Sequence, residues 1–123
     1  MNTAPLLPSR LSLQAPARAS LTELLNQHLA DLTDLVSQLN NAHWNVRGEH
    51  FHSLHKVFEE VAGMVESEID ELAERITALG GVAQGSVRQA AQASRLQPWP
   101  PGTQGFDLVA AMADRTAAAG GLG

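Results

Sequence analysis

Two histidines and three carboxylates occupy positions that suit metal binding. They are His43, His55, Glu59, Asp70 and Glu74. His55 and Glu59 are spaced i, i+4, as are Asp70 and Glu74, so the members of each pair lie on one face of a helix and can converge on one ion. The chain contains no cysteine, so imidazole nitrogens and carboxylate oxygens are the metal ligands that remain. The pattern indicates a metal site built from nitrogen and oxygen ligands.

The two pairs cannot meet within one helix. Their centres are about 15 residues apart, which corresponds to roughly 22 Å of helix, whereas metal–ligand bonds are about 2 Å long. In an antiparallel two-fold pair of helices, residue i faces residue j at a constant value of i + j. Positions 55 and 74 share that value with positions 59 and 70. We therefore predict that a second copy of the chain places its Asp70 and Glu74 beside His55 and Glu59.

Long amphipathic helices are needed to position these residues. Over residues 53–79, apolar side chains recur at three- and four-residue steps, which predicts a helix with one buried face. The ligand-type residues from His55 to Glu74 form a second stripe on the same helix. Ser20 and Glu23 match a capping box, so a preceding helix is predicted from Leu21 to about residue 45. On that helix, Glu23, Asp31 and Asp34 are expected to be solvated.

His43 lies on this preceding helix, in phase with its apolar residues Leu32, Val36 and Leu39. Taken alone, it suits a hydrogen-bonded core histidine, and the carboxylates suit a solvated helix face. The shared register of the two i, i+4 pairs favours the metal site over both of these simpler interpretations.

Several short strings accompany the ligand pattern: Ala42-His43-Trp44-Asn45-Val46-Arg47-Gly48, Ala73-Glu74-Arg75 and Leu79-Gly80-Gly81. Together with the five ligand-type residues, they resemble the Dps family of ferritin-like mini-ferritins over about residues 20 to 115. The resemblance implies an all-α, ferritin-like four-helix bundle with a ferroxidase centre at a two-fold interface between subunits. It also implies that His43, Asp70 and Glu74 are the principal iron ligands, that His55 and Glu59 are secondary ones, and that Trp44 lies beside the centre.

The activity implied by this resemblance is oxidation of Fe(II) by hydrogen peroxide or dioxygen, with storage of the iron and protection of DNA during starvation or oxidative stress. The expected assembly is a homo-oligomer, a shell of twelve subunits in the family. A cytoplasmic, nucleoid-associated location is expected, and no apolar run is long enough for a membrane span. Two alternatives stay open, namely a nucleic-acid-compacting protein with an incidental metal site, and a non-functional helical fragment.

Residues 1–19 contain three prolines and small polar residues, and they predict a disordered arm before a partial ferritin-like domain at 20–123. The only cationic side chains of the arm are Arg10 and Arg18, and the whole chain carries a net charge of −5. Because phosphate binding depends on the number of positive charges, this arm gives DNA binding little support.

The C-terminal region departs from the family pattern. Gly80 and Gly81 are expected to end the long helix, a weak helix is predicted within 82–96, and a further bundle helix is predicted from about Phe106. After Thr116 come three alanines and a glycine-rich end. We therefore expect the third bundle helix to be incomplete and the fourth to be missing from this sequence.

Overall fold

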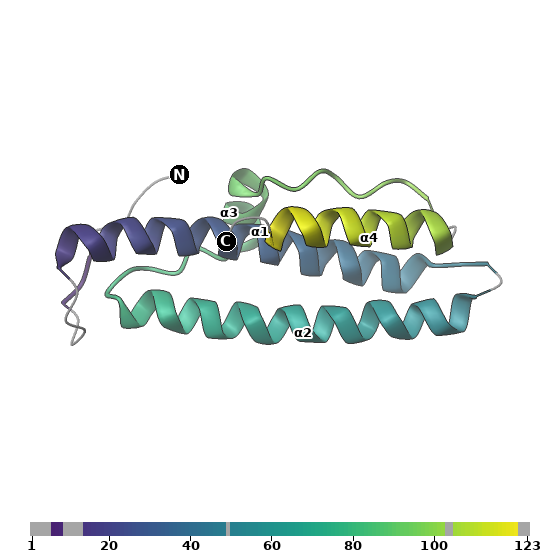
Figure 1. Cartoon of the computed structure of the whole chain (residues 1–123), viewed down its shortest axis with the longest axis horizontal. Helices are drawn as coiled ribbons and strands as arrows, with labels where there is room; N and C mark the ends of the chain where they lie inside the picture. The colour runs from purple at the N-terminus through teal and green to yellow at the C-terminus, as the bar shows by residue number, and fades with distance from the viewer. Residues whose placement is uncertain (1–5, 9–13, 49, 103–104, 121–123) are drawn as a thin grey trace.

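The computed structural model describes residues 6–8, 14–48, 50–102 and 105–120. Within these ranges the chain forms helices and no β-strand, so the predicted all-α class is confirmed (Figure 1). The helices are α1 (Ala15–Asn45), α2 (Phe51–Ala78), α3 (Val87–Ala93) and α4 (Gly105–Gly120). None of these helices is long and apolar enough to cross a membrane.

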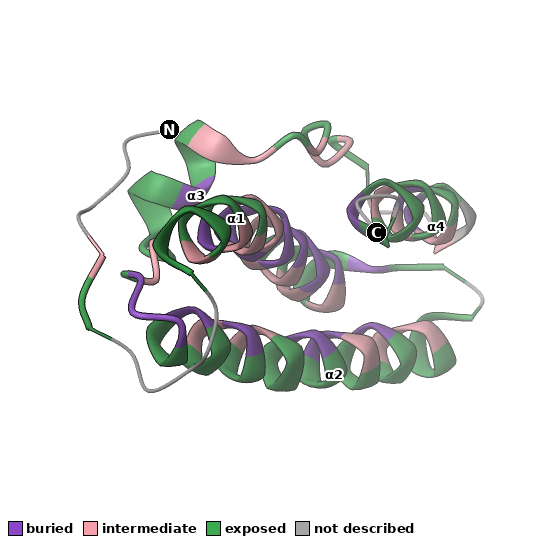
Figure 2. Cartoon of the chain, turned by 60° about the vertical axis from the view of Figure 1, so that its left-hand side comes forward, coloured by how far each residue is buried: buried purple, intermediate pink, exposed green. Residues whose placement is uncertain are grey.

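Helices α1 and α2 form a long antiparallel pair, and α4 lies alongside α1 over the half of the pair where α1 leads into α2 (Figure 1). The buried residues of α1 and α2 face one another, as the purple ribbon in Figure 2 shows. Among the residues whose burial is described, the core between the helices is mostly aliphatic and includes Phe58; its larger members are Leu29, Leu32, Leu35, Leu39, Phe58, Val65, Leu72, Ile76 and Leu108. The predicted apolar stripe of residues 53–79 is therefore the face of α2 that packs on α1.

Helix α1 begins earlier than the sequence predicts. It starts at Ala15 rather than Leu21, and Ser20 lies within the helix instead of capping it. Pro16 stands in the first turn, where a residue without an N–H costs no hydrogen bond because the first amides of a helix have no partner within it. Residues 15–19 are therefore helical and not disordered, whereas residues 1–5 and 9–13, which include Arg10, lie outside the described ranges.

The described part of the N-terminal segment is bound to the end of α2. The amide of Leu7 donates to the carbonyl of Gly80 at 2.6 Å. Arg18 Nη1 donates to the carbonyls of Leu7 at 3.1 Å and Leu79 at 2.9 Å. A guanidinium at a helix C-terminus is stabilised by the helix dipole. Gly80 has a φ of 85°, the left-handed conformation in which a glycine commonly ends a helix.

The expectation that Asp31 is solvated is wrong, because its side chain is fully buried. Its carboxylate accepts the backbone N–H of Arg95 at 2.9 Å, and Arg95 Nε and Nη2 donate to the same group at 3.2 and 3.0 Å. Gln27 adds a fourth donor at 3.3 Å. Burial of a carboxylate is tolerated only when such donors replace its water. Asp31 thereby attaches the chain that follows α3 to the middle of α1.

Other polar side chains of α1 bind the same connection between α2 and α4, mostly through its backbone. Asn26 Nδ2 donates to the carbonyl of Val82 at 3.0 Å, and its Oδ1 accepts the amide of Gln84 at 2.8 Å. Three further bonds follow along α1: Gln27 to the Ala93 carbonyl (2.8 Å), Ser94 to the Asp34 carboxylate (2.6 Å) and Gln38 to the Gln97 carbonyl (3.0 Å). Asp34 is therefore half-buried and bonded, not simply solvated as expected.

We predict that Asp31→Ala lowers the free energy of unfolding by about 2–3 kcal/mol, because the Arg95 amide and Gln27 lose a buried acceptor. The half-exposed Arg95 side chain can turn to water, which keeps the loss below that of a fully buried pair. Urea unfolding followed by circular dichroism measures the change. Glu23→Ala, an exposed change on the same helix, is the control and should alter stability by about 0.5 kcal/mol or less. Equal stability of the two variants would contradict the role of Asp31.

Candidate metal centre

His43, His55 and Glu59 come together within one chain, where α1 turns into α2. One ligand atom from each lies within 4.8 Å of the others. His43 stands near the end of α1, and His55 and Glu59 stand in the first turns of α2. The short connection after Asn45 brings these two helix ends side by side (Figure 1). Three of the five predicted ligand residues therefore lie together within one chain.

The two imidazoles are held by reciprocal hydrogen bonds to the opposite backbone. His43 Nδ1 lies 2.9 Å from the carbonyl oxygen of His55, and His55 Nδ1 lies 2.7 Å from the carbonyl oxygen of His43. A carbonyl oxygen only accepts, so each Nδ1 must carry the proton. In the neutral ring, Nε2 then has a free lone pair for a metal ion. We call this arrangement the histidine clasp of His43 and His55.

The clasp also fixes the rotation of the rings. Their centroids are 3.8 Å apart and their planes differ by 24°, so the rings are stacked. The ring of Phe51 lies 5.5 Å from that of His55 and tilts against it. A ligand ring held by a hydrogen bond on one nitrogen loses little rotational freedom when the other nitrogen binds a metal. The backbone carbonyls therefore hold both rings in place without an ion.

Glu59 completes the cluster from an exposed position, while both histidines are half-buried. Two nitrogen ligands and one oxygen ligand suit Fe(II) and neighbouring divalent transition metals rather than magnesium or calcium, which prefer oxygen alone. Three protein ligands leave coordination positions open for further ligands or for an oxidant.

Asp70 and Glu74 do not join this cluster within one chain. Both are exposed on α2. From residue 59 to residue 70 the helix rises roughly 16 Å, far beyond the length of a metal–ligand bond. Their exposure leaves them accessible to a second chain, and their role as ligands stays a prediction.

The two tryptophans have different surroundings. Trp44 follows His43 and is 71% exposed. Trp99, in the connection to α4, is half-buried and packs against the core. No residue pattern in the sequence pointed to the backbone carbonyls of His43 and His55, which orient the two rings, because carbonyl direction depends on how the helix ends approach each other.

Comparison with known proteins places this chain in a family. A model of the ferritin-like domain matches residues 22–118. The DNA protection during starvation protein 2 of Bacillus anthracis is 37% identical over 90 residues, which are 73% of this chain and 62% of that protein. The chain belongs to the Dps family of ferritin-like proteins. A second Dps relative, from Halobacterium salinarum, is 42% identical over 76 residues, 62% of this chain and 42% of its own length.

Solved Dps structures agree with the fold along nearly the whole chain. DpsC from Streptomyces coelicolor superposes with a TM-score of 0.90 at 26% identity, over 99% of this chain and 72% of that one. A Dps protein from Vibrio cholerae O1, described as a member of a superfamily of ferritin-like diiron-carboxylate proteins, superposes with a TM-score of 0.88 at 25% identity, over 97% and 76%. The predicted ferritin-like bundle of the Dps type is confirmed. The chain spans 62% of the first curated relative's length.

The histidine clasp should stabilise this Dps-type chain without metal. We predict that His55→Ala lowers the free energy of unfolding by about 1–2 kcal/mol in the presence of a chelator, because the hydrogen bond from His55 Nδ1 to the His43 carbonyl and the stacking of the two rings are lost. His55→Asn should recover most of the loss, since its amide N–H can replace Nδ1–H. His52→Ala, an exposed change on the same turn of α2, is the control. A His55→Ala variant as stable as His52→Ala would contradict the clasp.

Proposed function

We propose that this chain is a ferroxidase and iron-storage subunit whose substrate, Fe(II), binds between two chains. One chain supplies His43, His55 and Glu59, and a second supplies Asp70 and Glu74. The observation that carries the proposal is the histidine clasp, which presents two ring nitrogens beside Glu59 in a single chain. Exposed carboxylates on the helix that carries Glu59 supply further oxygen ligands.

The exposed face of α2 supports a two-chain site. Glu59, Glu66, Asp70 and Glu74 are all exposed, while the opposite face of α2 is buried against α1. An antiparallel contact between two α2 helices would place each histidine clasp beside the partner's acidic pair, twice by symmetry. Such a contact also needs a cation, because carboxylates brought together repel one another unless a positive charge lies between them.

The chemistry follows from the mixed ligand set. Imidazole helps to hold Fe(II), and carboxylates stabilise Fe(III), so oxidation is favoured at such a site. Two Fe(II) ions each give one electron to hydrogen peroxide, which takes up two protons and leaves as two water molecules. With dioxygen as the oxidant, four electrons and four protons are needed. Asp70 and Glu74 act as terminal or bridging ligands and His43 as a terminal ligand.

DNA protection is part of the proposal, through removal of Fe(II) and peroxide in the cytoplasm near the nucleoid. The relatives from B. anthracis and H. salinarum are named for DNA protection during starvation. A homo-oligomer, a shell of twelve subunits as in the family, would store the oxidised iron. Direct DNA binding is poorly supported, since the net charge is −5 and Arg18 is bonded to the end of α2. A nucleic-acid-compacting role therefore has no specific observation in its favour.

We predict that Asp70→Asn or Glu74→Gln lowers the rate of Fe(II) oxidation to the uncatalysed level without changing helical content. Both side chains are exposed on α2, so neutralising them opens no cavity, and the expected stability change is about 0.5 kcal/mol or less. Stopped-flow absorbance measures the oxidation, and circular dichroism measures the helix. Glu71→Gln, an exposed neighbour outside the ligand stripe, is the control. Parental oxidation rates in the Asp70 and Glu74 variants would reject these ligands.

A subunit-mixing experiment tests whether two chains share the site. His43→Asn with His55→Asn removes both Nε2 ligands and keeps an amide N–H near each carbonyl. The second variant carries Asp70→Asn with Glu74→Gln. Each variant alone should be inactive. After unfolding and refolding equal amounts together, about half of the dimers are mixed and hold one complete site of two, so roughly a quarter of parental oxidation should return. A mixture that exchanges subunits and stays inactive would place all ligands within one chain.

A further inference from the structure

Gly63 stands in the middle of α2, at a position where the fold of a single chain does not call for a glycine. Its φ is not positive, unlike those of Gly48 and Gly80. Apart from the backbone of its own helix, no described atom lies within 4 Å of the place that a Cβ would occupy. Glycine in a helix interior is less favourable than alanine, because its backbone loses more conformational freedom on folding. Gly63 therefore lowers the stability of α2 without allowing a close contact among the described residues.

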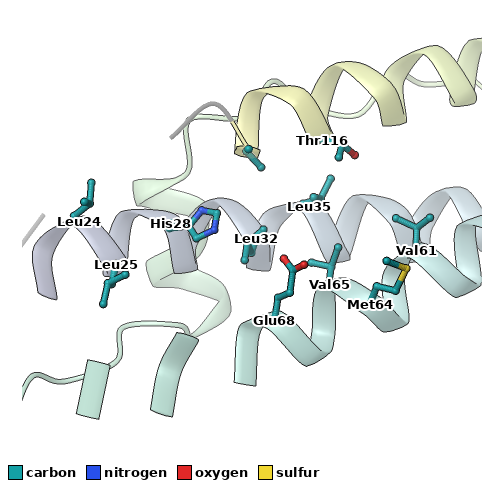
Figure 3. A pocket seen from close by; sticks show the side chains of 12 residues that line it. Leu24, Leu25, His28, Leu32, Leu35, Val61, Met64, Val65, Glu68 and Thr116 are labelled. Atoms are coloured by element: carbon teal, nitrogen blue, oxygen red, sulfur yellow. The ribbon is translucent and has the colours of Figure 1, made fainter. Parts of the chain in front are cut away.

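Gly63 is exposed on the face of α2 that carries the candidate ligands. At about 100° per residue, Glu59, Gly63, Glu66 and Asp70 fall within an arc of roughly 60°, and all four are exposed. The pocket between α1, α2 and α4 is lined from α2 by other residues, which are Val61, Met64, Val65 and Glu68 (Figure 3). In a single chain, a side chain at position 63 would thus extend from the ligand face into solvent.

The register inferred for the two-chain site pairs position 63 with position 66 of a second chain. These two positions share the value of i + j that pairs His55 with Glu74. The two-fold axis of this register passes between positions 64 and 65, so the pair lies closest to the axis on the ligand face. Glu66 of one chain would therefore lie over Gly63 of the other, twice by symmetry.

We propose that Gly63 is a positioning residue, which lets two α2 helices approach closely enough for ligands from both chains to reach one ion. This inference rests on the proposed two-chain function. The separation of packed helices, about 8–10 Å between axes, depends on the side chains at the contact. Asp70 has a single methylene group before its carboxylate, and metal–ligand bonds are about 2 Å long, so Asp70 cannot span a wide gap. With only hydrogen at position 63, the methylene groups of Glu66 from the second chain can pack on the helix backbone.

Sedimentation equilibrium of the 123-residue chain tests this contact, with Zn(II) as the probe because it has no redox chemistry. A cation is required, since the carboxylates of facing helices otherwise repel one another. Gly63→Gln should weaken the Zn(II)-dependent dimer at least about tenfold, and Gly63→Ala should weaken it about threefold. Ser67→Ala, an exposed change on α2, raises helix propensity without adding bulk and should leave the dimer affinity unchanged.

The stability of the separate chain should change in the opposite direction. With a chelator present, Gly63→Ala should raise the urea midpoint of unfolding, as Ser67→Ala should, because alanine favours the helix in both cases. A glycine needed within one chain would instead give a lower midpoint when it is replaced. A stabler chain that forms a weaker dimer is therefore the expected signature of a contact between chains.

Three results would overturn the role of Gly63. They are a parental chain that stays monomeric with Zn(II), a Gly63→Gln dimer as tight as the parental one, and a lowered urea midpoint in Gly63→Ala. Failure of the proposed function gives a different result, namely a parental dimer that Zn(II) stabilises but that does not oxidise Fe(II). The dimer affinities still decide the role of Gly63 in that case, because they are measured without iron.

Discussion

Helix α1 is the element on which the other parts of the fold depend, because two of its faces hold different parts of the chain. Its apolar face packs on α2 through leucines such as Leu35 and Leu39. Its polar face binds the connection between α2 and α4 through Asn26, Asp31 and Gln38. The connection makes few hydrogen bonds of its own beyond the short α3, so these side chains replace the water that its backbone would otherwise bind. These hydrogen bonds therefore hold the irregular connection in one position along α1.

The position of this connection along α1 decides where α4 can lie. Arg115 of α4 donates to the carbonyls of Gln97 and Pro98, at the end of the segment that α1 holds. Leu108 of α4 is completely buried in the core. The polar contacts thus orient α4, and the burial of its apolar face supplies most of the stabilisation. An open pocket between α1, α2 and the end of α4 is lined mostly by aliphatic residues.

The group formed by His43, His55 and Glu59 depends on the same pairing of α1 with α2, at its other end. The reciprocal hydrogen bonds of the histidine clasp form only when the end of α1 and the start of α2 lie at a particular separation and rotation relative to each other. Buried packing around Phe58 and Leu39 sets both. The two rings therefore lose their conformational entropy during folding, so a later binding event does not have to order them again. The carboxylates of α2 beyond Glu59 stay exposed, and only a second chain could bring them to the clasp.

Much of this architecture follows from the sequence, because helical periodicity and glycine placement are local properties. The apolar stripe of residues 53–79, the helix end at Gly80 and the start of α4 within one residue of Phe106 all agree with the structure. The ligand types and their i, i+4 spacing were likewise readable without coordinates. These features depend on neighbours a few residues away, so composition and spacing suffice to predict them.

Tertiary structure alone decided the features that depend on distant partners. By residue type, Asp31 is expected to be solvated on the surface of a helix. Its burial is favourable only because Arg95, 64 positions later in the sequence, donates hydrogen bonds to its carboxylate. Ser20 has a capping pattern, yet α1 extends back to Ala15 and Arg18 on that extension binds the end of α2. The tautomers of His43 and His55 are set by carbonyl groups, which every residue carries and no sequence pattern distinguishes. Residue identity therefore determined which candidate ligands are present, and the approach of two helix ends determined which of their ring nitrogen atoms are bonded to the backbone.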